Sequence, residues 1–143
     1  QQKYQYGNYI NQVFNDDYAS GVATSSHSTL ITATNNITYR GSSIQLSMPY
    51  SLLLKQISAR SESTNANNPP KDVVLLGSND NGQTFDLIVD TAFPSGVKTA
   101  ITTITPTITN TTAYNMIRMV ISKFQGTGGT AILEYFDLIG DVY

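Results

Sequence analysis

A short stretch near the N-terminus carries the residues best suited to hold a metal ion. Asn15 and Asp17 are followed closely by Ser20, and with backbone carbonyls these side chains offer several oxygen ligands within one loop. Calcium takes about 6–8 hard oxygen ligands of this kind. One interpretation is therefore a calcium-binding loop, and the other is a solvated turn rich in Asn and Asp.

The single histidine, His27, lies in the polar segment ATSSHS. An imidazole that is joined by amides, a guanidinium and an aromatic ring can hold both the hydroxyls and the apolar face of a sugar. If the loops converge, His27 forms a ligand-binding site with Asn35, Asn36, Tyr39 and Arg40. The alternative is an exposed loop histidine without a ligand.

Two charged residues stand where the strand pattern would bury them. Arg118 lies in an apolar stretch, and Glu134 is in phase with Phe136 and Leu138. A buried charge needs a partner, because its desolvation is otherwise uncompensated. We predict a structural ion pair between Arg118 and either Glu134 or Asp137.

The remaining residues do not suggest an enzyme. A Ser-His-Asp system would have to use His27, and the chain has no nucleophile-elbow motif. Asp16 and Asp17 are adjacent, so on an extended backbone they would point apart rather than face each other across a cleft. The absence of Cys also excludes a thiolate nucleophile, a thiolate zinc site and a disulfide framework.

Length, charge and hydropathy limit the function further. The chain has 143 residues, which predicts a single domain over 1–143, and its net charge is −2. This charge provides no electrostatic basis for nucleic-acid binding, and no apolar run approaches the roughly 18 residues of a membrane span. Ser, Thr and Asn instead make up nearly a third of the residues.

The order of apolar and polar residues predicts an all-β fold. Ile44, Leu46 and Met48 alternate with polar residues before Pro49 interrupts the pattern, and further strand patterns follow at short intervals. Regular short strands with turn residues between them are typical of a sandwich or jelly roll, here with roughly eight main antiparallel strands. The predicted segments are 43–48, 51–60, 72–76, 85–89, 99–112, 114–121 and 131–139, with a hairpin turn at 79–82.

Four segments, taken in order, resemble the discoidin or coagulation-factor type C domains of the galactose-binding-like superfamily. LLGSNDNGQTF at 75–85 is similar to their "GSNDG-x-x-W" hairpin, and YNMIRMVI at 114–121 is similar to "Y-x-x-x-R-L-V-I". FDLIG at 136–140 resembles their closing strand, and residues 41–52 resemble "G-x-W-I-Q-I-x-L-P-x-P-Y-x-L". The chain departs from the pattern by having Phe85 and Ser43 at aromatic positions and by lacking the terminal disulfide.

The resemblance implies a non-catalytic jelly-roll β-sandwich whose loops bind glycans, lipids or proteins. In related carbohydrate-binding modules a carboxylate on the closing strand completes a structural calcium site, which would add Glu134 to Asn15, Asp17 and Ser20. No other cofactor is implied. Because it has no cysteine, this chain resembles the divergent versions of the domain in proteins of large DNA viruses and phages.

Two functions remain open on these grounds. The first is a surface recognition module for carbohydrate or adhesion, which would act outside the cell or on a particle and bind a glycan or glycoprotein. The alternative is a structural subunit of a virion, fibre or other extracellular assembly that packs against copies of itself or other subunits. A surface with few charges and many hydroxyls and amides suits either function.

Overall fold

The computed structural model describes residues 3–6, 29–61, 70–94, 102–124 and 133–143. In this part of the chain every element is a β-strand and every strand pair is antiparallel, which confirms the predicted all-β class. None of it forms a helix long and apolar enough to cross a membrane. The strands are β1 (Lys3–Tyr6), β2 (Thr29–Thr32), β3 (Thr38–Ser61), β4 (Pro70–Ser78), β5 (Asp86–Ala92), β6 (Thr102–Ile104), β7 (Tyr114–Phe124) and β8 (Leu133–Val142).

The long strand β3 joins the two layers of the sandwich. Its residues 42–47 pair with β7, whereas its residues 52–61 pair with β8. The register shifts between Ser47 and Leu52, where Pro49 has no N–H to donate to a ladder. Leu52 lies at the crossing and is paired with Tyr114 of β7 and with Val142 of β8.

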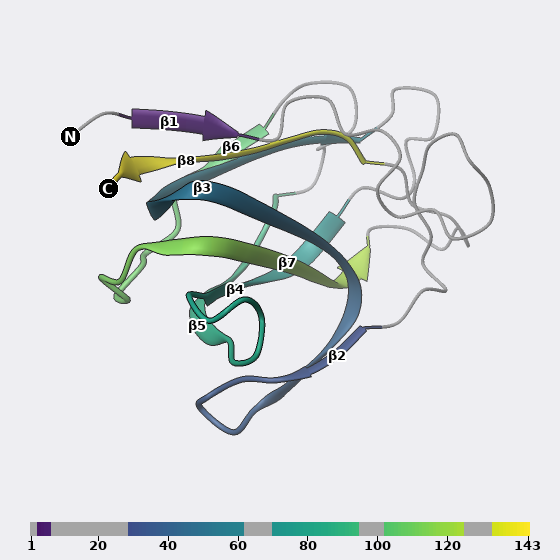
Figure 1. Ribbon diagram of the computed structural model, residues 1–143. Helices are drawn as coiled ribbons and strands as arrows, with labels where there is room; N and C mark the ends of the chain where they lie inside the picture. The colour runs from purple at the N-terminus through teal and green to yellow at the C-terminus, as the bar shows by residue number, and fades with distance from the viewer. Residues whose placement is uncertain (1–2, 7–28, 62–69, 95–101, 125–132) are drawn as a thin grey trace, which may run out of the picture.

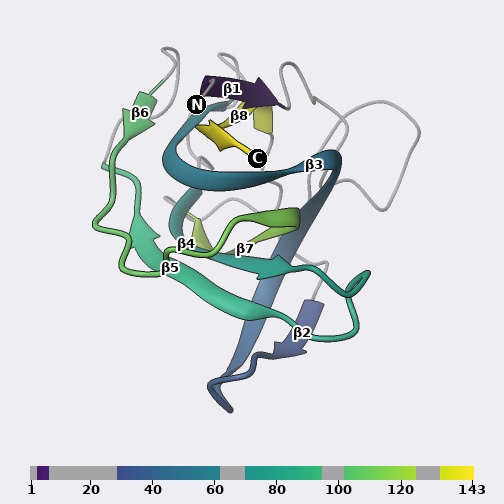
Figure 2. The ribbon, with the colours of Figure 1, turned by 60° about the vertical axis from the view of Figure 1, so that its left-hand side comes forward.

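The strand order β1-β8-β3-β7-β4-β5 therefore folds over at β3. β1 and β8 lie with the second half of β3 on one side, and β7, β4 and β5 lie on the other (Figure 1). Figure 2 shows β3 turning from one layer to the other. The main core fills the space between the layers and includes buried side chains of both halves of β3 and of β4, β5, β7 and β8.

A second, smaller apolar cluster lies on the other face of β4 and β7. Val74 and Leu76 of β4 and Met116 and Val120 of β7 form it together with Phe85. The hairpin of β2 and β3 contributes to the same cluster, since its residues Ala33, Ile31 and Tyr39 pack there. The main core packs on one face of β4 and β7, and the smaller cluster packs on the other face. Both strands are therefore apolar on both faces, as the sequence of β7 predicts.

One glycine allows β3 and β8 to approach closely. A Cβ atom added at Gly140 would lie 2.1 Å from the carbonyl oxygen of Leu53 and 3.1 Å from the Cα atom of Leu54. Backbone atoms cannot move aside as a flexible side chain can, so a larger residue would push the two strands apart. The glycine that ends the predicted closing strand is therefore required by packing.

The structure corrects three details of the sequence-based strands. The separate strands predicted at 43–48 and 51–60 are one continuous strand, β3. Of the predicted edge strand 99–112, only Thr102–Ile104 pairs with a neighbour within the described residues. The short strand β2 is not predicted, because its four residues are too few to give a clear alternation.

Replacing the leucine at the crossing tests the role of β3. Leu52 is 0% exposed, so we expect Leu52→Ala to lower the free energy of unfolding by about 2–5 kcal/mol through lost burial and a cavity. Leu30→Ala is the matched control, because Leu30 is 60% exposed. Denaturant unfolding measures both variants, and equal losses for the two would contradict the proposed importance of the crossing.

Candidate functional site

The β2–β3 hairpin carries four of the five residues predicted to bind a ligand. Its turn is closed by hydrogen bonds from the Asn36 N–H to the Ala33 carbonyl (2.9 Å) and from the Ala33 N–H to the Ile37 carbonyl (3.0 Å). Asn36 has a φ of 66°, in the left-handed region that asparagine tolerates better than most residues. The Asn35 carboxamide oxygen accepts from the Ile37 N–H at 2.9 Å, which fixes the tip.

The structure brings Asn35 and Tyr39 together but separates Arg40 from them. The Asn35 side-chain amide donates to the Tyr39 hydroxyl at 3.0 Å. Tyr39 packs against the second apolar cluster, whereas Arg40 is the next residue of β3 and points to the opposite face of the strand, across from Leu30. The predicted five-residue site is therefore not formed as one surface, and His27 lies outside the described residues.

A polar network, which the sequence did not indicate, anchors this hairpin to the sandwich. The Thr34 N–H donates to the Phe85 carbonyl at 2.9 Å, and the Thr34 hydroxyl donates to the Asp86 carboxylate at 2.6 Å. The other Asp86 oxygen accepts from the Tyr114 hydroxyl at 2.8 Å. Burial, followed by the neighbouring carboxylate, raises the pKa of Tyr114, so this phenol stays protonated and donates over the physiological range.

The hairpin that joins β4 to β5 is held by its own side chains. Asn81 and Gly82 have φ values of 61° and 83°, as the predicted turn at these residues requires. The Asp80 carboxylate accepts from the Thr84 N–H (2.9 Å), from the Thr84 hydroxyl (2.5 Å) and from the Ser78 hydroxyl (2.7 Å). These hydrogen bonds, with those from Thr84 the strongest, lower the pKa of Asp80 to about 2.

Arg118 lies on the outer face of β7 rather than in the core. Its Nε donates to the Ser43 hydroxyl at 3.1 Å, and its terminal N–H donates to the Gln45 side-chain oxygen at 3.4 Å. Partial burial lowers the pKa of the guanidinium, which still remains charged at neutral pH. Both of these hydrogen-bond partners are neutral and come from the neighbouring strand β3.

The predicted ion pair between Arg118 and Asp137 does not fit this geometry. The neighbours of Asp137 in β8, Phe136 and Leu138, both pack into the main core, so Asp137 faces away from it. Arg118 also faces away from the core, but on the other layer, so the two side chains lie on opposite sides of the sandwich. The pair with Glu134 stays a prediction, because that side chain lies outside the described part of the structure.

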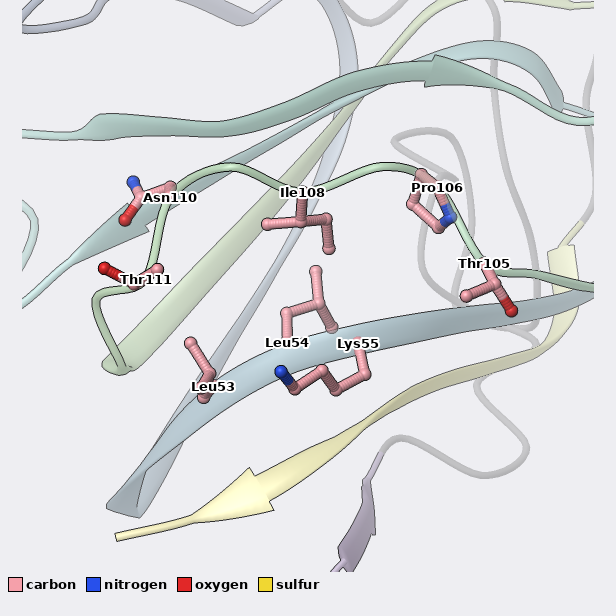
Figure 3. A pocket seen from close by; sticks show the side chains of 8 residues that line it. All are labelled: Leu53, Leu54, Lys55, Thr105, Pro106, Ile108, Asn110 and Thr111. Atoms are coloured by element: carbon pink, nitrogen blue, oxygen red, sulfur yellow. The ribbon is translucent and has the colours of Figure 1, made fainter.

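A groove of about 180 Å³ opens between β3 and residues 105–111 (Figure 3). Leu54 and Ile108 point toward each other across it, with Thr105 and Pro106 at one end and Asn110 and Thr111 at the other. Leu53 and Lys55 complete the lining. The groove is not predicted from the sequence, because no local pattern pairs residues 53–55 with residues 105–111.

Residues 105–113 run beside β3 without joining its ladder. No backbone–backbone hydrogen bond of this segment is present among the described residues. Side chains hold it instead: Gln56 donates to the Thr105 hydroxyl at 2.9 Å, Asn110 donates to the Leu87 carbonyl at 3.0 Å, and Asn79 donates to the Ala113 carbonyl at 2.9 Å. Pro106 has no N–H, which is why the pairing of β6 with β3 stops just before it.

The predicted calcium site cannot be placed. Asn15, Asp17 and Ser20 lie outside the described residues, as does the side chain of Glu134. The described residues contain no group of three or more His, Asp or Glu side chains that could hold a metal ion. Calcium therefore remains a prediction for the N-terminal loop.

The sequence matches no family model and no curated protein, but solved structures with a similar fold include carbohydrate-binding modules. A family 32 carbohydrate-binding module of Clostridium perfringens NanJ, in complex with galactose, is 10% identical with a TM-score of 0.55, over 96% of this chain and 92% of that one. The CBM32-5 module of C. perfringens, in complex with GalNAc-β-1,3-galactose, is 18% identical with a TM-score of 0.55, over 96% and 93%. The chain has the galactose-binding-like fold.

A third similar structure is the C-terminal domain of a chitobiase from Bacteroides fragilis. It is 24% identical with a TM-score of 0.55, and the match covers 71% of this chain. The chain spans only 64% of the length of that domain. The likeness confirms the predicted β-sandwich fold, and at these identities it concerns the fold alone.

The hydrogen bonds of Asp80 make stability depend on acid pH. The folded-state pKa of about 2 lies below the ordinary aspartate value of 3.8, so the carboxylate stabilises the fold above pH 3.8, and this contribution is lost as the pH falls through about 2. We expect the urea midpoint of the wild type to fall over this range more than that of Asp80→Asn. Parallel profiles for the two proteins would show that Asp80 makes no such contribution.

The predicted calcium site has a direct thermal test. A resident ion that binds only the folded chain stabilises it, so EDTA should lower the melting temperature and added calcium should restore it. Magnesium, which demands a stricter geometry, is the control ion. A melting temperature that EDTA leaves unchanged would remove the calcium hypothesis.

Proposed function

We propose that this chain is a non-catalytic carbohydrate-binding module. The observation that carries the proposal is the likeness of its fold, over nearly its whole length, to modules solved with galactose and with GalNAc-β-1,3-galactose. The low charge of the chain supports it, because neutral amides and hydroxyls match the hydrogen-bonding groups of a sugar. Its partner would be a glycan or a glycoprotein surface.

The tip of the β2–β3 hairpin is the proposed binding surface. Asn35, Asn36 and the edge of Tyr39 stand together there on a backbone fixed by the turn hydrogen bonds. Such a rigid tip presents amide groups to a ligand at little entropic cost. His27 would join them from the preceding loop, as the sequence predicts. Arg40 lies on the opposite face of the hairpin and would not contact the same ligand.

Two finer proposals rest on the sequence motifs. The order of the four motifs at 41–52, 75–85, 114–121 and 136–140 supports a discoidin-type member of the superfamily, in a cysteine-free form. Recognition of a glycoprotein surface would place the chain outside the cell or on the surface of a particle. The observations favour this recognition role over that of a structural subunit.

A pair of matched substitutions tests the binding surface. Asn36 and Asn81 both have left-handed φ values, which glycine adopts without strain, so Asn36→Gly and Asn81→Gly each remove an amide side chain and retain the backbone. We expect Asn36→Gly to weaken binding of galactose or N-acetylgalactosamine about three- to tenfold, the equivalent of one or two hydrogen bonds. Asn81→Gly, on a different hairpin, should bind as the wild type does.

Isothermal titration with each sugar, preceded by a glycan array, measures this difference. Equal binding by both variants would move the site away from the hairpin tip. A blank array together with a concentration-dependent oligomer in light scattering would reject carbohydrate binding and favour an assembly subunit.

A further inference from the structure

The groove between β3 and residues 105–111 has an apolar floor. Leu54 is almost fully buried beneath it, whereas Leu53 and Ile108 are only partly buried and line the groove. Pro106 adds a rigid ring at one end (Figure 3). A ligand that lies on these side chains must therefore present C–H groups to them, as one face of a pyranose ring does.

The rim of the groove consists of hydrogen-bond donors that the fold does not use. The Thr105 hydroxyl accepts from Gln56 but donates to no described residue, and the Thr111 hydroxyl has no partner among the described residues. The amide of Asn110 is different, since it already donates to the Leu87 carbonyl and to the Tyr114 hydroxyl. Asn110 therefore forms a wall, and a ligand beside it must supply an acceptor to Thr111.

Lys55 provides the one charge in the lining of the groove. It is the extra residue of a β-bulge, because Leu54 pairs with Gly140 and Gln56 pairs with Ile139. Lys55 is exposed and forms no ion pair within the described part of the chain, although Asp141 lies opposite Leu53 on β8. A ligand carboxylate would thus meet an ammonium that has no competing partner.

We propose that this groove binds a single carboxylate-bearing sugar, such as a hexuronate. The carboxylate accepts from Lys55, a hydroxyl oxygen of the sugar accepts from Thr111, and the C–H face of the ring lies on Leu53 and Ile108, which are only partly buried. The volume of about 180 Å³ lies below the roughly 300–1,000 Å³ of typical ligand pockets, which suits one ring rather than an oligosaccharide. The proposal rests on the proposed carbohydrate-binding function and adds a second subsite that selects an acidic sugar.

The experiment is an NMR titration of the isotope-labelled chain with sodium D-glucuronate and, separately, with D-glucose. We expect glucuronate to shift the amide signals of residues 53–55 and 105–111 with a Kd on the order of 1 mM, and glucose to leave them unmoved. Raising the salt concentration should weaken the binding, because exposed charges are screened at high ionic strength.

Lys55→Gln should weaken glucuronate binding at least about tenfold, since it removes a charge-assisted hydrogen bond. Lys123→Gln, which removes an exposed lysine at the far end of β7, is the matched control and should bind normally. Thr111→Val tests the hydroxyl without a change of charge and should cause a smaller loss. Equal binding of glucuronate by Lys55→Gln and the wild type, or equal binding of glucose and glucuronate, would overturn the proposal.

The two proposals fail in different ways. If galactose binds at the hairpin and glucuronate does not bind at the groove, the second subsite is wrong and the carbohydrate-binding function stands. If glucuronate shifts only signals outside residues 53–55 and 105–111, the groove is again wrong. If no sugar binds at either place, both proposals are wrong.

Discussion

The whole sandwich depends on one strand that belongs to both of its layers. Leu52, at the crossing in β3, is paired on one side with Tyr114 and on the other with Val142. The corner is closed by the last residue of the chain, because Ser51 and Tyr143 exchange two backbone hydrogen bonds of 3.2 and 2.8 Å. Since each layer buries only one face against the other, a break at this corner would expose the main core from both sides.

The segment after β6 covers the open edge of the sandwich. Ile104 and Ile108 pack against the core, whereas the intervening Thr105 and Thr107 are exposed. A Thr-rich, proline-interrupted segment of this kind covers sheet edges without offering a regular ladder to another chain. Because side chains rather than a ladder hold it, it stands slightly off β3, and this separation creates the groove.

The periodic parts of the fold could be predicted from the sequence, and the long-range pairings could not. The alternation at Ile44, Leu46 and Met48 and the doubly apolar stretch of β7 indicate which strand faces are buried. Asn81 and Gly82, with their left-handed φ values, mark the turn. Whether β3 continues as one strand through Pro49 depends on which strands pair with each of its halves. Such pairing leaves no local signal in the order of residues.

The same limit applies to the candidate site. Asn35 and Tyr39 are four residues apart in one hairpin, so their contact follows from local geometry. The sequence does not separate Arg40 from them, because it does not show which face of the strand each side chain occupies. The charge of Arg118 predicts a carboxylate partner, yet neighbouring β3 supplies a hydroxyl and an amide from residues more than seventy positions away.

The abundance of neutral polar residues also has a different meaning in the structure than in the composition. Many of these side chains bond to one another across strands: Thr29 with Ser43 at 2.8 Å, Thr32 with Thr38 at 2.7 Å and Ser58 with Thr103 at 2.6 Å. Their hydrogen-bonding capacity is therefore largely used within the fold, where each pair aligns two strands. A hydroxyl-rich surface is not uniformly able to bind a sugar, and ligand binding is favoured only where donors remain unused, as they do at Lys55 and Thr111 beside an apolar floor.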